Sequence, residues 1–347
     1  SMDYYLQCIE CGEAYDRHYS NQICEKCGGL LEVVYKKNLP KIKSISSFWD
    51  LEPVLPYGKY RKFELGLTKT IKAKEKDLWL KLEIDNPTHS FKDRGSVIEV
   101  AKAREYGFDE LVCASTGNMA YSLAYYAKAY GIKAKIFVSK NVSKDKMEYI
   151  RKTHDADITK INGDFTMAQR HAEHYAKVNN VFLTGDYCYR KEGQKTIMYE
   201  LADIKPDYIF VPVGNATLIS GMLKALNELK NSKVLSKAPK IIGVEAEKCS
   251  PLYKAFETGK LKYEKPYTKA DAIAVGYPTF GNQAIDMLKK FNGSIITVSD
   301  EEMIKEQRRF YDEYGLVAEL AGIASIVAYR KIMPKGKSVA IISGGNV

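Results

Sequence analysis

Apolar residues gather in short runs from about residue 110 to the end of the chain, and amphipathic stretches separate these runs. Short apolar runs bounded by turn residues predict buried strands. They cover residues 110–115, 134–139, 181–185, 208–214, 240–247, 294–300 and 338–343. Between them, residues 118–131, 164–178 and 191–204 show helical patterning, and Asp164 is a favoured helix cap. Strands that alternate with helices predict βαβ units, parallel sheets and an α/β fold.

Helix boundaries are also readable near the C-terminus. Ser299 and Glu302 have the spacing of a capping box, which predicts a helix that starts there and ends near Gly315. Near the N-terminus, the apolar residues 30–35 predict one further strand.

Four of the seven cysteines form two CxxC pairs. They are Cys8, Cys11, Cys24 and Cys27. Gly12 and Gly28 follow the second cysteine of each pair, where a tight turn favours glycine. Four thiolates with this spacing can surround one Zn²⁺ tetrahedrally, and they leave no open position for catalysis. The pattern predicts a structural zinc-ribbon-like module over residues 1–37, whereas the alternatives are chance pairs or a redox dithiol.

Composition narrows the class of protein. The 347 residues are 45% hydrophobic and 28% charged, which is typical of globular proteins, and their number favours two domains. The net charge is +10, but the lysines are scattered, which favours small anionic ligands over nucleic acid. No apolar run approaches the roughly 18 residues of a membrane helix. No basic-then-apolar leader opens the sequence, so we expect a cytoplasmic protein with no membrane or nucleic-acid partner.

Three expected strand ends carry small polar residues, and ligands of α/β folds bind beyond such ends. At residues 214–218, a glycine and small residues precede a helix, so backbone amides could hold a phosphate; an ordinary βα turn is the alternative. Residues 115–118 offer hydroxyls and an amide, or simply a helix cap. At residues 343–346, a serine and two glycines could approach a flat ligand, unless they are a frayed terminus.

Lys92 lies in the stretch NPTHSFKDRG, residues 86–95, where a loop is expected to become a helix. It is either a surface lysine or an amine that forms an imine with an aldehyde cofactor. Burial beside Phe91 would favour its neutral, nucleophilic form. Pyridoxal phosphate requires such an amine, a phosphate-binding loop, a partner for its pyridine nitrogen and an amide near its ring hydroxyl.

These segments resemble the fold-type II pyridoxal-phosphate enzymes, and most closely the threonine synthase family. The family's NPTxSFKDRG motif is matched at residues 86–95 and its STGN loop at 115–118. Its RxEGQKT segment is matched at 190–196 and its VPVGN strand at 211–215. A cysteine-knuckle N-terminus also occurs in this family. The similarity covers nearly the whole chain, and several motifs in order are more specific than any one alone.

The resemblance implies a fold of two doubly wound domains of the tryptophan synthase β-like type, after the N-terminal module. The larger, cofactor-binding domain would comprise residues 45–96 and 188–347. The smaller α/β domain would comprise residues 97–187. Homodimers are usual among such relatives, so a homodimer is expected by analogy.

The resemblance also implies roles for the residues at these loops. Lys92 would hold the cofactor and then take the Cα proton, Phe91 would lean on the ring and Asn118 would bond the ring hydroxyl. Ser343 would face the pyridine nitrogen, and its neutral hydroxyl fits elimination and replacement better than transamination. The cofactor phosphate would be held by Gly214, Asn215, Ala216, Thr217 and Leu218. The substrate carboxylate would be received by Ser115, Thr116 and Gly117.

Four other residues leave more than one interpretation open. His89 could touch substrate or only fill a loop. Arg94 could pair with a phosphate or carboxylate, or anchor the start of a helix. His171 and His174 lie three apart and could bind metal, but a solvated helix face is favoured because no matching carboxylate is in view.

The chain departs from the threonine synthase pattern at positions expected near the substrate. The family's GxGNTPL is replaced by residues 63–71, which keep only Thr68. The hydroxyl-rich run after STGN becomes Met-Ala-Tyr-Ser at 119–122, and Gly-Asn in the phosphate loop becomes Thr217 and Leu218. The SGGN ending is more similar to threonine and serine dehydratases.

Three functions follow from these observations. The first is threonine synthase, which converts the amino acid O-phosphohomoserine and water into threonine and phosphate. The second is a pyridoxal-phosphate-dependent serine or threonine dehydratase, or a β-replacement enzyme, with a different amino-acid substrate. The more remote third is a zinc-ribbon nucleic-acid-binding protein, which Lys92 and the lack of clustered basic residues disfavour.

Overall fold

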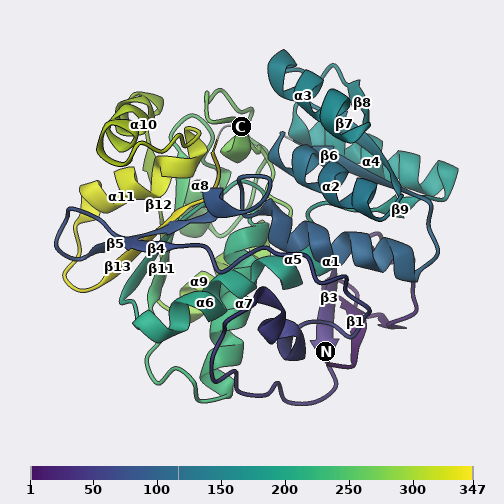
Figure 1. Ribbon diagram of the computed structural model, residues 1–347, viewed down its shortest axis with the longest axis horizontal. Coiled ribbons are helices and arrows are strands. Elements are labelled where there is room, and N and C mark those ends of the chain that lie inside the picture. Colours follow the sequence, from purple (N-terminus) through teal and green to yellow (C-terminus); the bar gives the residue numbers. More distant parts are fainter. Residues whose placement is uncertain (1, 116, 346–347) are drawn as a thin grey trace. The chain divides into compact units, whose positions relative to one another are not determined.

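The computed structural model describes residues 2–115 and 117–345 (Figure 1). The chain forms two compact units, and neither is continuous in sequence. The first unit comprises Ser1–Leu65 and Lys92–Thr196, and the second comprises Gly66–Phe91 and Ile197–Val347. The expected site residue Thr116, and Asn346 of the C-terminal motif, lie outside the described residues.

The first unit begins with a small antiparallel sheet in the order β2-β1-β3. Its strands are β1 (Tyr4–Cys8), β2 (Ala14–Asp16) and β3 (Leu31–Tyr35). Alternate residues of β1 are buried, namely Tyr4, Leu6 and Cys8, as expected for a strand with one covered face. The strand predicted at residues 30–35 is therefore confirmed as β3.

A four-stranded parallel sheet forms the rest of this unit, in the order β8-β7-β6-β9 (Figure 1). Its strands are β6 (Glu110–Ser115), β7 (Lys133–Val138), β8 (Asp157–Lys160) and β9 (Phe182–Leu183). Its helices are α1 (Lys92–Glu105), α2 (Asn118–Ala129), α3 (Lys144–His154), α4 (Phe165–Asn179) and α5 (Cys188–Gln194). Asp164 caps α4 as predicted, because its side chain accepts a hydrogen bond from the backbone N–H of Met167.

The N-terminal module shares a hydrophobic core with this α/β sheet. Leu6 and Val33 of the small sheet belong to the same buried cluster as Val97 of α1 and Leu123 of α2. The 3-10 helix η1 (Phe48–Val54) contributes to this core as well. Residues 45–65, 92–96 and 188–196, which were predicted to belong to the larger domain, fall in the first unit.

The second unit contains a six-stranded sheet in the order β12-β11-β10-β13-β5-β4, parallel except for the edge strand β4. The strands are β4 (Thr70–Lys72), β5 (Leu78–Leu82), β10 (Tyr208–Pro212), β11 (Lys240–Ala246), β12 (Ser294–Val298) and β13 (Ser338–Ile342). Its helices are α6 (Thr196–Leu201), α7 (Thr217–Asn231), α8 (Pro251–Thr258), α9 (Gly281–Lys290), α10 (Asp300–Tyr314) and α11 (Ala324–Ile332). Its 3-10 helices are η2 (Glu83–Asp85), η3 (Ala202–Ile204), η4 (Asp271–Ile273) and η5 (Ala321–Ile323). The parallel sheets predicted from the alternating pattern are confirmed in both units.

Two helix predictions have different outcomes. Ser299 and Glu302 form the expected capping box of α10, and Gly315 ends that helix in a left-handed conformation. The single helix predicted over 191–204 is wrong, because the structure divides it into α5, α6 and η3. At the break, the hydroxyl of Thr196 donates to the carbonyl of Gly193 at 2.6 Å and competes with the helical backbone pattern.

Among the described residues, no helix is both long and apolar enough to span a bilayer.

Candidate functional site

Lys92 is the first residue of α1, as the sequence indicates. Just before it, the backbone N–H of Phe91 donates to the carbonyl of Ser343 at 3.0 Å, and Gly345 N–H donates to the carbonyl of His89 at 2.9 Å. Ser90 and Gly344 form an antiparallel bridge between these two bonds. The continuation of β13 therefore runs beside residues 89–91 and holds the buried Ser343 next to the residue that precedes Lys92.

Arg190 holds the first turns of α1 from the neighbouring helix α5. Its guanidinium donates to the carbonyl of Lys92 at 2.9 Å, to the hydroxyl of Ser96 at 2.9 Å and to the carboxylate of Glu99 at 2.8 Å. The side chains of Arg190 and Glu99 are completely buried. A guanidinium presents donors in a fixed fork, so these three bonds fix the position of the Lys92 turn.

Glu99 is the acceptor at the centre of this network. Besides Arg190, it accepts hydrogen bonds from Gln22 Nε2 at 2.6 Å and from the backbone N–H of Gly185 at 2.9 Å. Burial raises the pKa of Glu99 to about 7, while Arg190, Gln22 and Gly185 act in the opposite direction. No role was predicted from the sequence for Gln22, Glu99 or Arg190; the one available signal was the presence of Arg190 in the RKEGQKT segment.

The charge of Lys92 acts on the thiol of Cys113, a buried residue of β6. Burial raises the pKa of the Cys113 thiol, and the positive charges of Arg190 and Lys92 oppose that rise. Cys113 is completely buried, so these charges are felt inside the first unit and only weakly screened.

The loop from β6 to α2 is organised by Ser115. Its hydroxyl accepts hydrogen bonds from the backbone N–H groups of Gly117 at 2.9 Å and Ala120 at 2.8 Å. Gly117 has φ 134°, a conformation that disfavours any side chain, and Asn118 starts α2 with only 7% of its surface exposed. The helix-cap interpretation thus describes the Ser115 hydroxyl.

The loop from β10 to α7 is built differently. Gly214 is required by packing, because a Cβ atom there would lie 2.6 Å from the carbonyl oxygen of Ala272. The Asn215 side chain accepts a hydrogen bond from the Thr279 N–H at 2.6 Å, and Ala216 adopts a left-handed conformation (φ 67°). No side chain caps α7, so the N-terminal amides and the helix dipole face this loop. Such an end suits a phosphate.

Two candidate residues of the second unit lie at the ends of adjacent strands. β10, which precedes the loop at 214–218, pairs in parallel with β13, which precedes Ser343. The second unit therefore brings the expected phosphate loop and the expected partner of the pyridine nitrogen to one edge of its sheet. Phe91 and His89 belong to this unit too, whereas Lys92, Ser115, Gly117 and Asn118 belong to the first.

The residues with open interpretations are placed as follows. Arg94 is completely buried and donates to the hydroxyl of Thr196 at 2.9 Å, which favours a structural role. His89 is half-buried in a left-handed conformation (φ 66°), and its Nδ1 lies 3.3 Å from the carbonyl oxygen of Ile84. His171 and His174 are exposed on α4, in agreement with a solvated helix face.

The four cysteines converge on one point. Their Sγ atoms all lie within 4.8 Å of one another, with 3.4 Å between Cys8 and Cys27 and 3.6 Å between Cys11 and Cys24. Four sulfurs at about 2.3 Å from a tetrahedral Zn²⁺ would be about 3.8 Å apart, so this cluster has the size of a zinc site. Gly12 and Gly28 adopt positive φ in the two turns, as the CxxC-Gly pattern predicts.

Comparison with known proteins gives the family. Residues 63–344 match the family described as pyridoxal-phosphate dependent enzymes. The chain is 34% identical to a threonine synthase of Methanosarcina acetivorans, over 96% of this chain and 88% of that protein. It is 31% identical to a threonine synthase of Methanocaldococcus jannaschii, over 95% and 88% of the two chains.

Solved structures show a common fold. The processed form of threonine deaminase isoform 2 from Solanum lycopersicum has a TM-score of 0.66 at 24% identity, and covers 78% of this chain and 79% of its own. A fungal L-serine ammonia-lyase from Rhizomucor miehei has a TM-score of 0.72 at 22% identity, over 81% and 94% of the two chains. With the sequence matches, these show that the chain belongs to the pyridoxal-phosphate dependent enzyme family, as a threonine synthase-like lyase of fold type II.

Proposed function

We propose that the protein is a threonine synthase, which converts O-phosphohomoserine and water into threonine and phosphate. The observation that carries this proposal is the similarity to threonine synthases over 96% and 95% of the chain. The placement of Ser343 beside the residue that precedes Lys92 supports the cofactor assignment.

The residues described fit pyridoxal phosphate. When bound, the cofactor supplies an aldehyde that links to an amine and a ring that accepts electrons from Cα. Lys92 would provide the amine and later take the Cα proton of the substrate, and Phe91 would lean on the ring. Asn118 would bond the ring hydroxyl. The uncharged Ser343 hydroxyl would face the ring nitrogen and leave it unprotonated.

The phosphate of the cofactor would be bound by the loop at 214–218, through the backbone amides at the start of α7. The carboxylate of the substrate would bind at the loop 115–117. Because the Ser115 hydroxyl already accepts two backbone hydrogen bonds, it would contribute its remaining proton, and the Gly117 backbone would allow close approach. His89 remains a candidate substrate contact.

A serine or threonine dehydratase, or a β-replacement enzyme, is the second candidate, because Met119 and Ala120 replace the hydroxyl residues that follow the STGN loop in the family. Met119, Ala120 and Tyr121 are all buried there. Fewer hydroxyl donors at this position would weaken the hold on a substrate phosphate. An unphosphorylated amino acid would place no such demand on these residues.

One substrate panel separates these functions. Purified protein would be given O-phosphohomoserine, serine and threonine in turn, and phosphate, ammonia and keto acid would be measured together. We expect phosphate and threonine from O-phosphohomoserine. Keto acid and ammonia from serine or threonine, without phosphate release from O-phosphohomoserine, would establish the second candidate instead.

The proposed covalent bond between the Lys92 amine and the cofactor can be tested directly. Borohydride should fix the cofactor on the peptide that contains Lys92, and Lys92→Ala should lose this label. Lys133→Ala is the control, since Lys133 is an exposed residue of β7. A Lys92→Ala protein that keeps a yellow, borohydride-bleachable band would refute the assignment.

We also propose that the four cysteines bind one structural Zn²⁺ and that the protein is a cytoplasmic homodimer. A reducing compartment keeps thiols available to metal. Metal analysis of protein purified without chelator should give about one zinc per chain. A chain with no zinc would contradict the metal assignment, and light scattering that shows a monomer would contradict the homodimer.

A further inference from the structure

Gln22 connects the cysteine module to the helix that begins with Lys92. It lies two residues before Cys24, and its side chain is completely buried. Its Nε2 donates to Glu99 at 2.6 Å and to the carbonyl of Leu183 at 2.9 Å, and its Oε1 accepts from the Tyr189 N–H at 3.0 Å. One amide therefore contacts α1, the end of β9 and the first turns of α5.

From Gln22, a continuous series of hydrogen bonds leads to the backbone of Lys92. Gln22 donates to Glu99, Glu99 accepts from Arg190 at 2.8 Å, and Arg190 donates to the Lys92 carbonyl at 2.9 Å. All three side chains are completely buried, so loss of one partner is not compensated by water.

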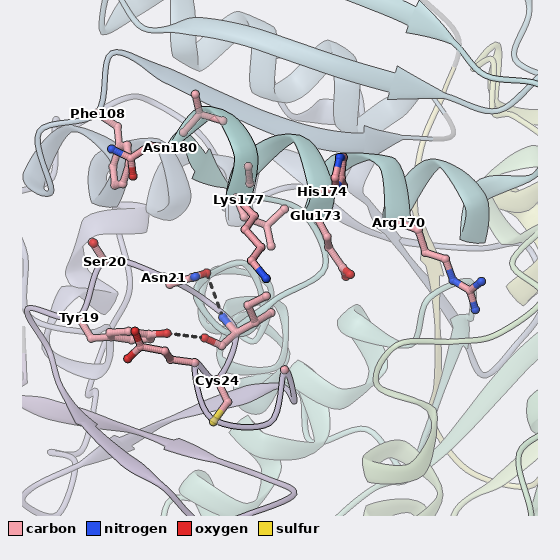
Figure 2. Close-up of a pocket in the computed structure, with 16 residues that line it drawn as sticks. Tyr19, Ser20, Asn21, Cys24, Phe108, Arg170, Glu173, His174, Lys177 and Asn180 are labelled. Atoms are coloured by element: carbon pink, nitrogen blue, oxygen red, sulfur yellow. Dashed lines mark hydrogen bonds between the residues drawn. The ribbon is translucent and has the colours of Figure 1, made fainter.

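The loop that carries Gln22 has little packing on its outer side. A cavity of about 660 Å³ lies between residues 19–25 and α4, and Figure 2 shows Tyr19, Asn21 and Cys24 at its edge. Within the loop, the Tyr19 hydroxyl donates to the Ile23 carbonyl at 2.8 Å. On the side away from the cavity, the loop is held by the buried bonds of Gln22, by its own hydrogen bonds and by the cysteine cluster at its end.

Two other contacts between the module and α5 do not involve Glu99. The hydroxyls of Tyr4 and Tyr189 lie 2.7 Å apart, and Lys191 pairs with Glu32. The hydrogen bonds of Gln22, by contrast, include the Glu99 carboxylate itself.

We propose that Gln22 is a positioning residue for Lys92, and that the cysteine cluster sets the loop from which Gln22 orients Glu99, Arg190 and the first turns of α1. This inference rests on the proposed roles of Lys92 and of the metal. It gives the cysteine module a function in catalysis, although the module contributes no group to the reacting atoms.

Hydrogen exchange of α1 tests the proposal without any need for bound cofactor. In Gln22→Ala, we expect amides 96–99 to exchange about tenfold faster, because the bonds that hold the first turns are weakened. Gln7→Ala is the matched control: Gln7 is in the same module, and its amide bonds only the Gly12 carbonyl in the described contacts. Equal exchange in α1 for wild type and Gln22→Ala would overturn the proposal.

A second variant separates positioning from a general loss of stability. Tyr4→Phe removes the hydroxyl contact between the module and Tyr189 but leaves Gln22 and Glu99 unchanged. We expect urea unfolding to show a loss of stability in this variant, while amides 96–99 keep the wild-type exchange rate. Acceleration of these amides in Tyr4→Phe equal to that in Gln22→Ala would contradict the proposal.

The cofactor and the metal provide two further measurements. In Gln22→Ala, the pH at which the visible absorbance of the cofactor changes should shift by about one unit, because Lys92 is displaced.

Removal of metal from wild-type protein should speed exchange of amides 96–99 as Gln22→Ala does. Unchanged exchange would overturn the role of the cysteine cluster. If borohydride labels no cofactor at Lys92, the proposed function fails, while the exchange experiments still decide the positioning role of Gln22.

Discussion

The first unit buries Glu99 and the second buries Glu245, and the two carboxylates are satisfied by different groups. In the first unit, Glu99 is paired with Arg190 at 2.8 Å and bonded by the Gln22 amide. In the second, Glu245 of β11 accepts from the backbone N–H groups of Leu252 at 3.1 Å and Tyr253 at 2.7 Å. Burial raises the pKa of Glu99 to about 7 and that of Glu245 to about 8. Burial is the largest cause of the raised pKa at both sites; Arg190, Gln22 and Gly185 oppose it at Glu99, and the backbone amides of Tyr253 and Leu252 oppose it at Glu245.

The two ligand loops repeat this contrast. The β6–α2 loop is organised by a side chain, because Ser115 bonds two of its amides. In the β10–α7 loop no side chain caps the helix; Gly214, the left-handed Ala216 and the Asn215 side chain, which accepts from the Thr279 N–H, shape the turn. The start of α2 is therefore organised by a polar side chain, and the start of α7 mainly by backbone geometry and small residues. Substitutions should act through different mechanisms in the two loops.

The largest effect is expected from Arg190→Met. It leaves the Glu99 carboxylate buried without its cation, which costs about 3–5 kcal/mol, and it releases the Lys92 carbonyl. Urea unfolding should show the loss, and borohydride should label less cofactor at Lys92. Arg308→Met, at an exposed residue of α10, should change the unfolding midpoint little. If Arg190→Met were as stable as this control, the charged network would not be what holds the first unit.

A smaller, pH-dependent effect is expected from Glu245→Gln. Because the folded pKa of Glu245 is raised above its usual value, its contribution to stability is full at low pH and is lost as the pH rises through about 8. A glutamine does not ionise, but its one side-chain oxygen can replace only one of the two carboxylate oxygens that accept from Leu252 and Tyr253, which is a pH-independent loss. Its advantage over glutamate should grow from about pH 5 to about pH 9, on the order of 3 kcal/mol.

Unfolding free energies measured across this pH range would check the Glu245 prediction. Glu247→Gln is the matched control, since Glu247 is exposed and only two residues away. Parallel curves for wild type and Glu245→Gln would show that the two amides already compensate for the burial of the charge.

The smallest effect is expected from Ala216→Gly. The left-handed conformation of Ala216 (φ 67°) strains an L-residue by about 1 kcal/mol, which glycine avoids, while glycine adds about 0.5–1 kcal/mol of unfolded-state entropy. We expect a change between zero and about 0.5 kcal/mol in favour of the variant. Ala225→Gly, in the interior of α7, should instead lose about 1 kcal/mol or more. Similar losses at both positions would show that Ala216 is not strained.

Local features were predictable from the sequence because neighbouring residues determine them. Eight strands, the Asp164 cap, the Ser299 capping box and the start of α1 at Lys92 follow from spacing within a few residues, whereas β1, β2, β4, β5 and β8 were not predicted. The convergence of the four cysteines followed from the chemistry of the paired CxxC turns.

The buried polar network was not predictable, because its members are far apart in the chain. Gln22 and Glu99 are separated by 77 residues, and Glu99 and Arg190 by 91. No local pattern distinguishes these side chains from solvated ones. The break at Thr196 was missed for a similar reason, since the helical pattern continues through 191–204 while the chain passes from one unit to the other.

The pairing of β5 with β13 has a consequence for synthesis of the chain on the ribosome. β5 pairs in parallel with β13, so Leu78–Leu82 must wait for Ser338–Ile342, which are made much later in synthesis. The first unit, by contrast, has all its residues once Thr196 has emerged. Until β13 has been made, one side of β5 is an open strand edge, and such edges invite contact with other nascent chains. Truncation before β13 would therefore leave β5 without its parallel partner.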